Sequence, residues 1–354
     1  EILRNMADRR RAMFTADAMR SFIVVGVGAL VLLAYRWKRI KEVPMVICLI
    51  ILCLADMWGV NKRYLNDGMF SAPSARMQEL QQTEADEMIL AANQGAYNRV
   101  LNLTVSTFND NTTSYYHKSI GGYHPAKLRR YQELIEEHIH QEMGRINRAI
   151  VDTRGELQEC NGDSLFPVLN MLNTAWVILG TKDGHKMAVP NPWAAGNAWY
   201  VPEVRYVGDA DAEIASLREI NPKHTAVADQ RFQDILGSSS EQDSTSFVVL
   251  KEYEANRLAY EATSTKGGVV VFSDIYYPGW SCTIDGKETP IARVNYVLRA
   301  IQVPAGKHSI VMSFYPKSVQ VTETIAYIAL ALLVVLTLIY GLVSLRRSRR
   351  GQSA

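Results

Sequence analysis

The feature that most constrains this chain is an uninterrupted apolar run from Ile325 to Leu345. The run contains no charged residue, and a helix needs about 20 apolar residues to cross the hydrocarbon core of a bilayer. Four arginines follow immediately within residues 346–350. A buried helix in the core of a soluble protein would rarely have an apolar run of this length with four arginines directly after it. The sequence therefore predicts a transmembrane helix at 325–345.

Two weaker apolar runs near the start predict a two-helix transmembrane hairpin over residues 21–60. The first run, 21–35, is short, but the arginines at its ends can extend toward the bilayer surface. The second contains one acid, Asp56. An acid inside a span often has a function, but Asp56 lies near the helix end beside Trp58, so an interfacial acid is an equal alternative. We expect residues 1–20 to form an amphipathic or interfacial segment.

The basic segments predict the orientation of the chain. The link 36–41 and the tail 346–354 concentrate lysine and arginine, so both should be cytoplasmic. An even number of spans separates them, and the two assignments agree. Residues 61–322 should then be extracytoplasmic, with a cytoplasmic C-terminus. The arginines at 9–11 oppose this orientation, because they precede the first span and would then lie outside the cytoplasm. Because the chain begins at Glu1, we expect it to be the C-terminal part of a longer protein.

Composition excludes several classes of site. The 354 residues carry a formal net charge of +2, which indicates no nucleic-acid partner. Cys48 and Cys53 lie in an apolar run and are expected to pack as small hydrophobic residues. Cys160 and Cys282 could pair only if the fold brings them together. The Cys and His spacing matches no zinc motif, and we expect no cofactor and no metal in this chain.

Residues 61–236 alternate helical and strand patterns, which predicts an extracytoplasmic α/β region. The clearest helix should begin at Pro125, where the missing N–H has no partner to lose, and run to about Val151. A polar helix is expected in 75–93 and a short one in 212–220. Predicted strands lie at 97–105, 176–179, 200–206 and 225–228.

A serine-rich linker at 237–246 precedes a change of pattern. Short strands separated by turns then predict a β-sandwich over residues 247–318. Asp285-Gly286 is the type of pair that supplies positive φ angles in a tight hairpin. The predicted class is thus a membrane protein of α+β type: three transmembrane helices, an α/β unit and a C-terminal β-sandwich. The expected strands are 247–250, 257–263, 268–274, 281–284, 290–292, 298–303 and 308–315.

Several short motifs in this order resemble the bacterial YfhO family of membrane proteins, and its Bacteroidetes branch in particular. The resemblance covers nearly the whole chain. The motifs are SYYHKSIGGYH at 114–124, PVLNML at 167–172, NPWAAGN at 191–197, YYPGW at 276–280, TIDGK at 283–287, RVNYVLR at 293–299 and VPAGKH at 303–308.

The resemblance implies a protein of the bacterial inner membrane, of the GT-C glycosyltransferase type. Such enzymes transfer a sugar from a polyprenyl-phosphate carrier to an acceptor outside the cytoplasm. Their catalytic acid lies in an early extracytoplasmic loop, so none of the present residues matches that role, Asp56 included. The implied partners are the lipid bilayer, a polyprenyl-phosphate-linked sugar and an envelope glycan. The alternative is a non-enzymatic, membrane-anchored protein that binds carbohydrate or serves as a scaffold in envelope assembly.

The best candidate for ligand contact is segment 106–130, where polar and aromatic side chains surround two glycines. Lysine and arginine can hold phosphate groups, and aromatic faces can stack on sugars. The alternative is that the tyrosines pack in the core and the cations are solvated. Trp280 most simply fills the sandwich core, and Arg293 most simply bonds backbone. The candidate residues are Asp110, Tyr115, His117, Lys118, Tyr123, His124, Arg129, Trp280 and Arg293.

Overall fold

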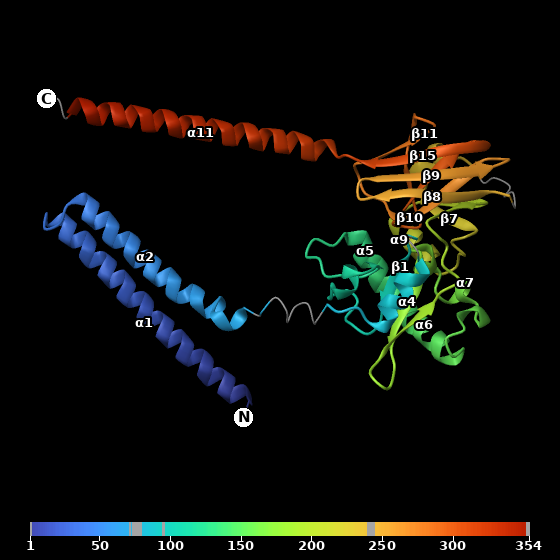
Figure 1. Cartoon of the computed structure of the whole chain (residues 1–354), viewed down its shortest axis with the longest axis horizontal. Helices are drawn as coiled ribbons and strands as arrows, with labels where there is room; N and C mark the ends of the chain where they lie inside the picture. The colour runs from blue at the N-terminus through green and yellow to red at the C-terminus, as the bar shows by residue number, and fades with distance from the viewer. Residues whose placement is uncertain (1, 71, 73–79, 94–95, 239–244, 352–354) are drawn as a thin grey trace. The chain divides into compact units, whose positions relative to one another are not determined.

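The computed structural model describes residues 2–70, 72, 80–93, 96–238 and 245–351 (Figure 1). The chain divides into two compact units, Glu1–Gln81 and Gln82–Ala354.

The first unit is a helical hairpin. Helix α1 (Ile2–Arg36) and helix α2 (Glu42–Tyr64) are joined by a short link and followed by the one-turn helix η1 (Asp67–Met69). Both long helices expose their large apolar side chains, as expected for surfaces that face lipid. Residues 4–36 and 42–69 are long and apolar enough to span a membrane. The predicted interfacial segment 1–20 is mostly part of α1, which runs unbroken from Ile2.

The acid inside the hairpin is paired. Asp56 Oδ1 of α2 lies 3.1 Å from Arg20 Nε of α1. Arg63 Nη1 of α2 donates to Asp17 Oδ1 of α1 at 2.6 Å. These two pairs join the helices and give Asp56 a structural role within the unit.

Helix α11 (Lys317–Gly351) supplies the third apolar helix, with a candidate span over residues 317–343. Its apolar side chains are also exposed. Three helices of this kind establish a membrane protein in contact with the bilayer.

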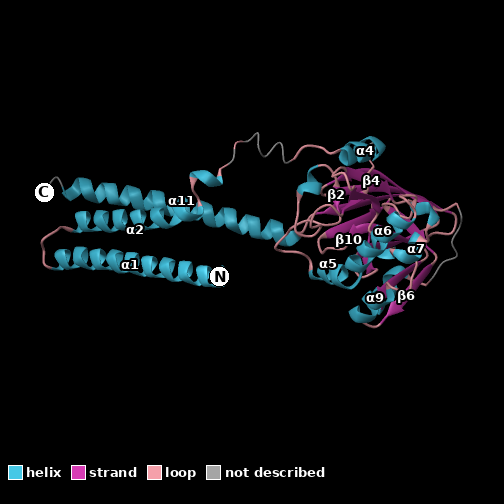
Figure 2. Cartoon of the chain, turned by 90° about the horizontal axis from the view of Figure 1, so that it is seen from below, coloured by secondary structure: helices cyan, strands magenta, loops and turns pink. Residues whose placement is uncertain are grey.

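The second unit contains three sheets (Figure 2). The smallest is mixed, since β1 pairs in parallel with β2 and β3 while β3 and β4 are antiparallel. Its order is β2 (Lys118–Ser119), β1 (Arg99–Asn102), β3 (Thr174–Gly180) and β4 (Lys186–Pro190).

The two larger sheets hold the remaining strands. The six-stranded sheet has the order β5 (Ala198–Val201), β10 (Gly268–Ile275), β14 (Leu298–Val303), β13 (Ala292–Val294), β7 (Thr225–Asp229) and β6 (Glu203–Val207). The five-stranded sheet is antiparallel throughout, with the order β12 (Lys287–Thr289), β11 (Trp280–Ile284), β15 (Gly306–Phe314), β9 (Arg257–Ser264) and β8 (Phe247–Glu254).

The six-stranded sheet is buried on both faces. Along β10, Val269 and Val271 pack with the helices, while Val270 and Phe272 pack against the five-stranded sheet. This explains why β10 is a continuous apolar run rather than an alternating one. Strands from both sides of the predicted 237–246 linker share this sheet, so the predicted α/β region and β module have one sheet in common. Residues 239–244 of that linker lie outside the described residues.

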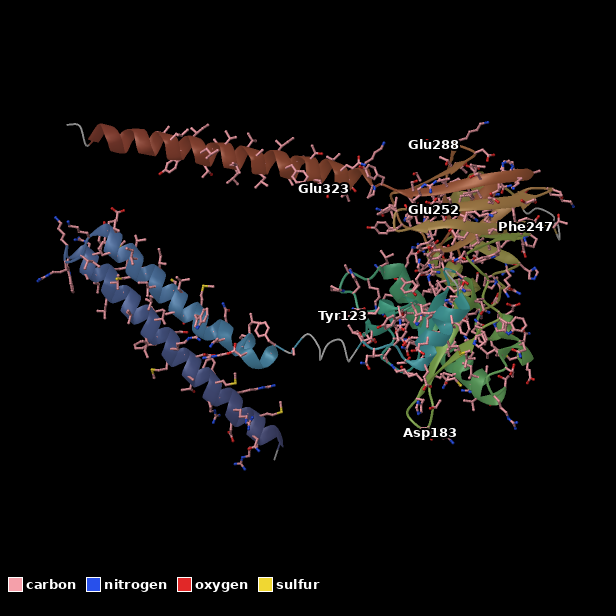
Figure 3. The ribbon with its side chains drawn as sticks, in the orientation of Figure 1. Tyr123, Asp183, Phe247, Glu252, Glu288 and Glu323 are labelled. Atoms are coloured by element: carbon pink, nitrogen blue, oxygen red, sulfur yellow. The ribbon has the colours of Figure 1, made fainter. Side chains whose placement is uncertain are left out.

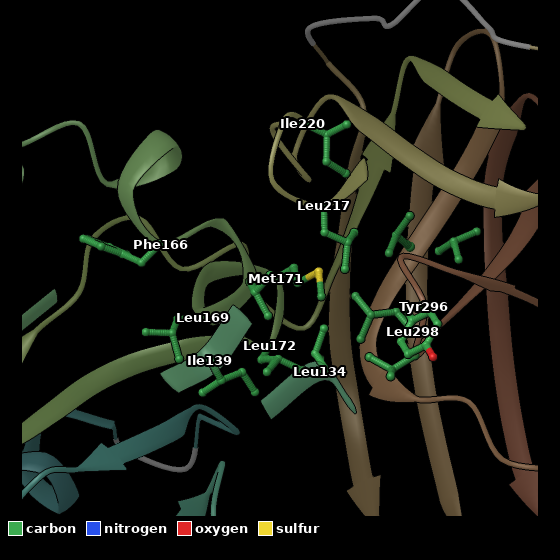
Figure 4. Packing of buried hydrophobic residues seen from close by; sticks show 14 of the residues in the cluster. Leu134, Ile139, Phe166, Leu169, Met171, Leu172, Leu217, Ile220, Tyr296 and Leu298 are labelled. Carbon is green, nitrogen blue, oxygen red and sulfur yellow. The ribbon is translucent and has the colours of Figure 1, made fainter. Parts of the chain in front are cut away.

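Helices cover the outer face of this sheet and pack into the main core (Figure 4). Leucines and isoleucines from separate helices meet there with Tyr296 and Leu298 of the β13–β14 hairpin. Besides α11, the described helices of this unit are α4 (Glu84–Asn93), η2 (Thr112–Tyr115), α5 (Arg129–Leu134), η3 (Ile135–Ile139), α6 (His140–Asp152), η4 (Leu157–Glu159), α7 (Gly162–Leu165), α8 (Pro167–Met171), α9 (Ala210–Ser216), η5 (Gln230–Phe232) and α10 (Gln233–Leu236).

Several element boundaries differ from the sequence prediction. The long helix begins at Arg129 instead of Pro125, because Leu128 is extended with ψ 128°. The single strand predicted at 200–206 is two strands, since Pro202 between them has no N–H to donate. Helix α9 ends at Ser216, before the predicted Ile220. The strand predicted at 290–292 is replaced by β12 and β13 on either side of Pro290.

The Asp285-Gly286 turn has the predicted positive φ angles, 50° and 79°, and it also holds an ion pair. Asp285 Oδ2 lies 2.6 Å from His308 Nδ1, and Asp285 Oδ1 accepts from the Ser309 N–H at 2.8 Å. The Asp285 carboxylate therefore raises the pKa of His308, and it is the principal cause of that shift.

We expect this pair to make stability depend on pH. A folded-state pKa above the unfolded value means that the stabilisation is complete below the unfolded value of about 6.5 and is lost as pH rises through the folded value. The melting temperature of His308→Gln should therefore lie below that of wild type at about pH 5. The difference between the two proteins should become smaller as pH is raised to about 8. A difference that stays constant over this range would contradict the assignment.

Candidate ligand pocket

Part of the predicted segment 106–130 is fixed by structural contacts. Asp110 Oδ1 accepts from the Thr112 N–H at 2.9 Å and closes a local turn. His117 is buried, with Nε2 2.9 Å from Asp86 Oδ1 of α4. A Cβ atom on Gly121 would lie 1.9 Å from the Thr107 carbonyl oxygen, so only glycine fits there. Asp110 and His117 thus act in holding the segment.

Other members of the segment reach solvent. Tyr115 and Tyr123 are exposed, and Tyr123 projects from the edge of the unit in Figure 3. The His124 ring accepts from the Ala126 N–H through Nδ1 at 3.0 Å. These three residues line none of the cavities described below.

Lys118 lies against two stacked tyrosines. The rings of Tyr97 and Tyr253 are 4.4 Å apart, and Lys118 Nζ lies 4.5 Å and 2.9 Å from their respective centroids. Burial lowers the pKa of Lys118 to about 8; Asp274 raises it and Arg99 lowers it further. Lys118 is therefore a cation held on aromatic faces with an amine that deprotonates near neutral pH.

This environment predicts an unusually reactive amine. Acetylation by acetic anhydride should reach half its maximal rate for Lys118 near pH 8, whereas an ordinary lysine requires about pH 10.4. Peptide mass spectrometry reports the modified site. Asp274→Asn removes a charge that raises the pKa of Lys118, so it should move the Lys118 midpoint to lower pH. A Lys118 midpoint near about pH 10.4, the ordinary lysine value, would refute the assignment.

One cavity of about 280 Å³ is lined mainly by tyrosine and arginine side chains, and we call it the tyrosine–arginine pocket. It brings the start of helix α5 together with the turn after β10 and the β13–β14 hairpin. Two candidate residues, Arg129 and Arg293, line it. Its walls are Leu128, Arg129, Arg130, Tyr131, Ile275, Tyr276, Tyr277, Pro278, Arg293, Tyr296 and Val297.

A buried carboxylate organises the arginines. Glu213 of α9 is fully buried, and its Oε2 lies 3.4 Å from Arg130 Nη1 and 3.2 Å from Arg293 Nη2. Its Oε1 accepts from the Tyr296 N–H at 3.0 Å. Burial raises the pKa of Glu213, an effect that the lowering by Arg293, the Tyr296 N–H and Arg130 only partly offsets. Glu213 therefore fixes three groups of the wall without lining it.

The hairpin turn that supplies Tyr296 is held in an unusual conformation. Asn295 and Tyr296 both have positive φ, 49° and 70°. Asn295 is fully buried and bonds both backbone groups of Val227, through its own N–H at 2.7 Å and its Oδ1 at 2.8 Å. The Arg130 guanidinium lies 4.4 Å from the centre of the Tyr296 ring. The turn thus presents an aromatic face covered by a cation.

A smaller cavity of about 240 Å³ shares Leu128, Tyr131 and Ile275 with this pocket. Arg99 lines it and donates to Asp274 Oδ1 at 2.8 Å. Trp280 lies elsewhere: it packs at the edge of the core between the two larger sheets, with the Arg299 guanidinium 3.8 Å from its ring centre. The structure thus brings two of the nine predicted site residues into the tyrosine–arginine pocket.

The wall of the pocket is connected to the start of the third apolar helix. The Gly279 carbonyl accepts from the Tyr315 N–H at 3.2 Å, and the Tyr277 ring lies 6.0 Å from Phe314. Helix α11 begins two residues after Tyr315, at Lys317. The pocket is therefore built directly beside the point where the chain enters its last candidate span.

The sequence predictions missed Tyr131, Tyr296 and Glu213, and they included Arg130 only as the last residue of segment 106–130. Tyr131 lies in the predicted long helix and Tyr296 in the RVNYVLR motif, so their closeness in sequence to Arg129 and Arg293 was an available signal. Glu213 had no such signal, because an acid in a short helix usually faces solvent. Cys160 and Cys282 both carry free thiols and lie in different hydrophobic clusters.

Three apolar helices and an α/β unit with a pocket beside the last of them define the class as an integral membrane protein. Residues 222–326 match the family model described as "Bacterial membrane protein YfhO", and this match supports a bacterial membrane protein of the YfhO family. The matched segment contains the YYPGW and RVNYVLR motifs that form much of the pocket wall. No curated protein and no solved structure matches the chain.

Proposed function

We propose that this chain is part of a membrane glycosyltransferase-like protein of the GT-C type. It would transfer a sugar from a polyprenyl-phosphate carrier to an extracytoplasmic envelope glycopolymer or lipid. The observation that carries the proposal is the tyrosine–arginine pocket beside the start of α11.

The composition of the pocket suits the end of a lipid-linked phosphate. Arginine binds phosphate oxygens through two parallel N–H groups, and Arg129 offers the most exposed guanidinium of the wall, with 92% of its side chain accessible. Leu128, Tyr277 and Pro278 give an apolar surface for the first isoprene units. A ligand of this kind would have to approach along the bilayer, and the connection of the pocket to the start of α11 supports such an approach.

The proposed location is the bacterial inner membrane, in a species of the Bacteroidetes type. Residues 61–322 would be extracytoplasmic, and the C-terminus cytoplasmic. We interpret the five-stranded sheet and the strands facing it as a β-sandwich that supports the pocket from behind. No nucleic acid and no cofactor are expected in this chain.

The orientation can be tested with single cysteines placed in a variant whose four native cysteines are replaced. Asp183→Cys lies in the β3–β4 turn, and Lys38→Cys lies in the link between α1 and α2. An impermeant thiol reagent should label position 183 in intact spheroplasts and label position 38 only after lysis. The reverse pattern would overturn the orientation.

The alternative is a membrane-anchored carbohydrate-binding or scaffolding protein of envelope assembly. It is favoured by the character of the pocket walls, which supply aromatic faces and guanidinium groups, the usual means of binding rather than of proton transfer.

Mass spectrometry of envelope glycopolymers separates the two proposals. Deletion of the parent gene should remove one sugar substituent, and the intact gene should restore it. A parent gene carrying Arg129→Met should restore it poorly, while the exposed-site control Lys182→Met should restore it fully. An unchanged glycan profile after deletion would exclude transfer and favour the scaffold.

A further inference from the structure

A second cavity of about 420 Å³ shares no wall residue with the tyrosine–arginine pocket. It lies between the segment after β1 and the long helix, and we call it the loop–helix pocket. Its size falls within the range of small-molecule sites, roughly 300–1,000 Å³. The walls are Leu103, Val105, Ser106, Thr107, Phe108, Asn109, Lys127, Gln132, Ile135, His140 and Met143.

The helix changes its winding at this pocket. Residues 135–139 form the π-helical turn η3 between α5 and α6, and His140 follows immediately. A π turn inserts one extra residue, which rotates every later side chain by about 100° relative to the first part of the helix. Such insertions are uncommon and recur at functional sites. Here the insertion sets the face on which His140 and Met143 line the cavity.

Two basic side chains flank one aromatic ring in the wall. The Phe108 ring meets the His140 ring edge-on, with centroids 5.5 Å apart, and Lys127 Nζ lies 5.4 Å from the Phe108 centroid. Within the described ranges, no carboxylate pairs with Lys127. Its ammonium is therefore a positive charge at the cavity, close to the Phe108 ring.

The rest of the polar wall consists of hydroxyl and amide groups. Ser106, Asn109 and Gln132 can each donate and accept. Such groups suit a ligand with several hydroxyls, and the Phe108 ring suits the C–H face of a pyranose. The ammonium adds a preference for negative charge.

We propose that the loop–helix pocket binds a monosaccharide unit that carries one anionic group, with its carboxylate or phosphate on Lys127 and its ring against Phe108. The proposal does not depend on sugar transfer from a lipid carrier. It applies equally to an enzyme that holds an acidic acceptor and to a protein that anchors an acidic glycan.

The test uses the full chain in detergent or nanodiscs and three probes: glucuronate, glucose 6-phosphate and glucose. Ligand-observed NMR titration should give about tenfold tighter binding for at least one charged sugar than for glucose, as expected for one charge-assisted contact. Lys127→Met retains most of the side-chain stem and should remove this preference. Lys182→Met, which changes an equally charged but exposed residue, should leave it intact.

A preference for glucuronate would identify a carboxylate sugar, and a preference for glucose 6-phosphate a phosphorylated one. Phe108→Leu should weaken all three probes by a similar factor, with its melting temperature measured to exclude unfolding. Equal affinity for charged and neutral sugars would overturn the proposal, as would an effect of Lys127→Met no larger than that of Lys182→Met. Failure of the glycan-profile experiment would leave this result unaffected, so the two proposals fail separately.

Discussion

Replacing Glu213 by leucine is expected to destabilise the second unit by about 3–5 kcal/mol, the usual cost of removing one partner from a buried ion pair. Arg293, whose side chain is 8% exposed, would lose its carboxylate partner in the interior. The Tyr296 N–H would lose its acceptor in the same step. Chemical denaturation of the purified chain, followed by tryptophan fluorescence, measures the loss.

Two further variants identify the cause of the stability loss in Glu213→Leu. Glu213→Gln retains an oxygen for the Tyr296 N–H and removes only the charge, so its cost should fall between those of wild type and the leucine variant. Glu219→Leu changes an exposed acid shortly after the same helix and should stay within about 0.5 kcal/mol of wild type. If Glu213→Leu were as mild as Glu219→Leu, Glu213 would not organise the pocket.

The same substitution should affect binding. Glu213 positions Arg130, Arg293 and the Tyr296 turn, so its loss should disorder one wall of the tyrosine–arginine pocket while leaving the loop–helix pocket unchanged. A folded Glu213→Gln protein that still binds charged sugars through Lys127 would show that the two cavities act independently.

The membrane helices could be predicted from the sequence because their signal is local. An apolar run of sufficient length has few alternatives, and each of the three predicted runs coincides with a candidate span, apart from the last two residues of the run 325–345. Strand β9 could be predicted from the sequence equally well, since buried residues alternate with exposed or half-exposed ones along the whole strand.

The arrangement of the strands could not be predicted in the same way. Strand β10 pairs with β5 across an interval of about 70 residues, and β13 pairs with β7 across the serine-rich segment. No local pattern encodes these pairings. The serine-rich composition of 237–246 predicts a domain boundary, but the six-stranded sheet contains strands from both sides of that segment. The candidate site shows the same limit: Arg293 could be selected from its motif, whereas Glu213 gains its role only from burial among distant residues.

The second large effect is expected at Glu142, another buried acid that no sequence pattern indicated. Glu142 lies in α6, is 1% exposed, and accepts from the Val168 and Leu169 N–H groups of α8 at 3.1 and 2.8 Å. Glu142→Leu would leave both N–H groups unsatisfied in the core and should cost about 2–5 kcal/mol. Glu136→Leu, at an exposed position just before α6, is the matched control and should cost less than about 1 kcal/mol.

Glu142 should also make the stability of this unit fall as pH rises. Burial raises its pKa to about 7, against the lowering effect of the two N–H groups and Arg145. Between the unfolded value of about 4.3 and the folded value, the folded chain holds a proton that the unfolded chain has released, so the free energy of unfolding decreases with pH. The decrease should amount to about 4 kcal/mol at about 1.4 kcal/mol per pKa unit.

Glu142→Gln cannot titrate and should lose this slope while keeping one acceptor for the α8 N–H groups. The free energy of unfolding, measured by urea denaturation at several values from about pH 4.5 to about pH 7, tests the expectation. The double variant Glu142→Gln/His308→Gln also removes His308, the second group whose contribution to stability falls as pH rises. The contribution of His308 falls mainly above about pH 6.5. If the slope below that pH were the same in wild type and Glu142→Gln, the buried carboxyl would have to be ionised throughout, balanced by Arg145 at 4.0 Å.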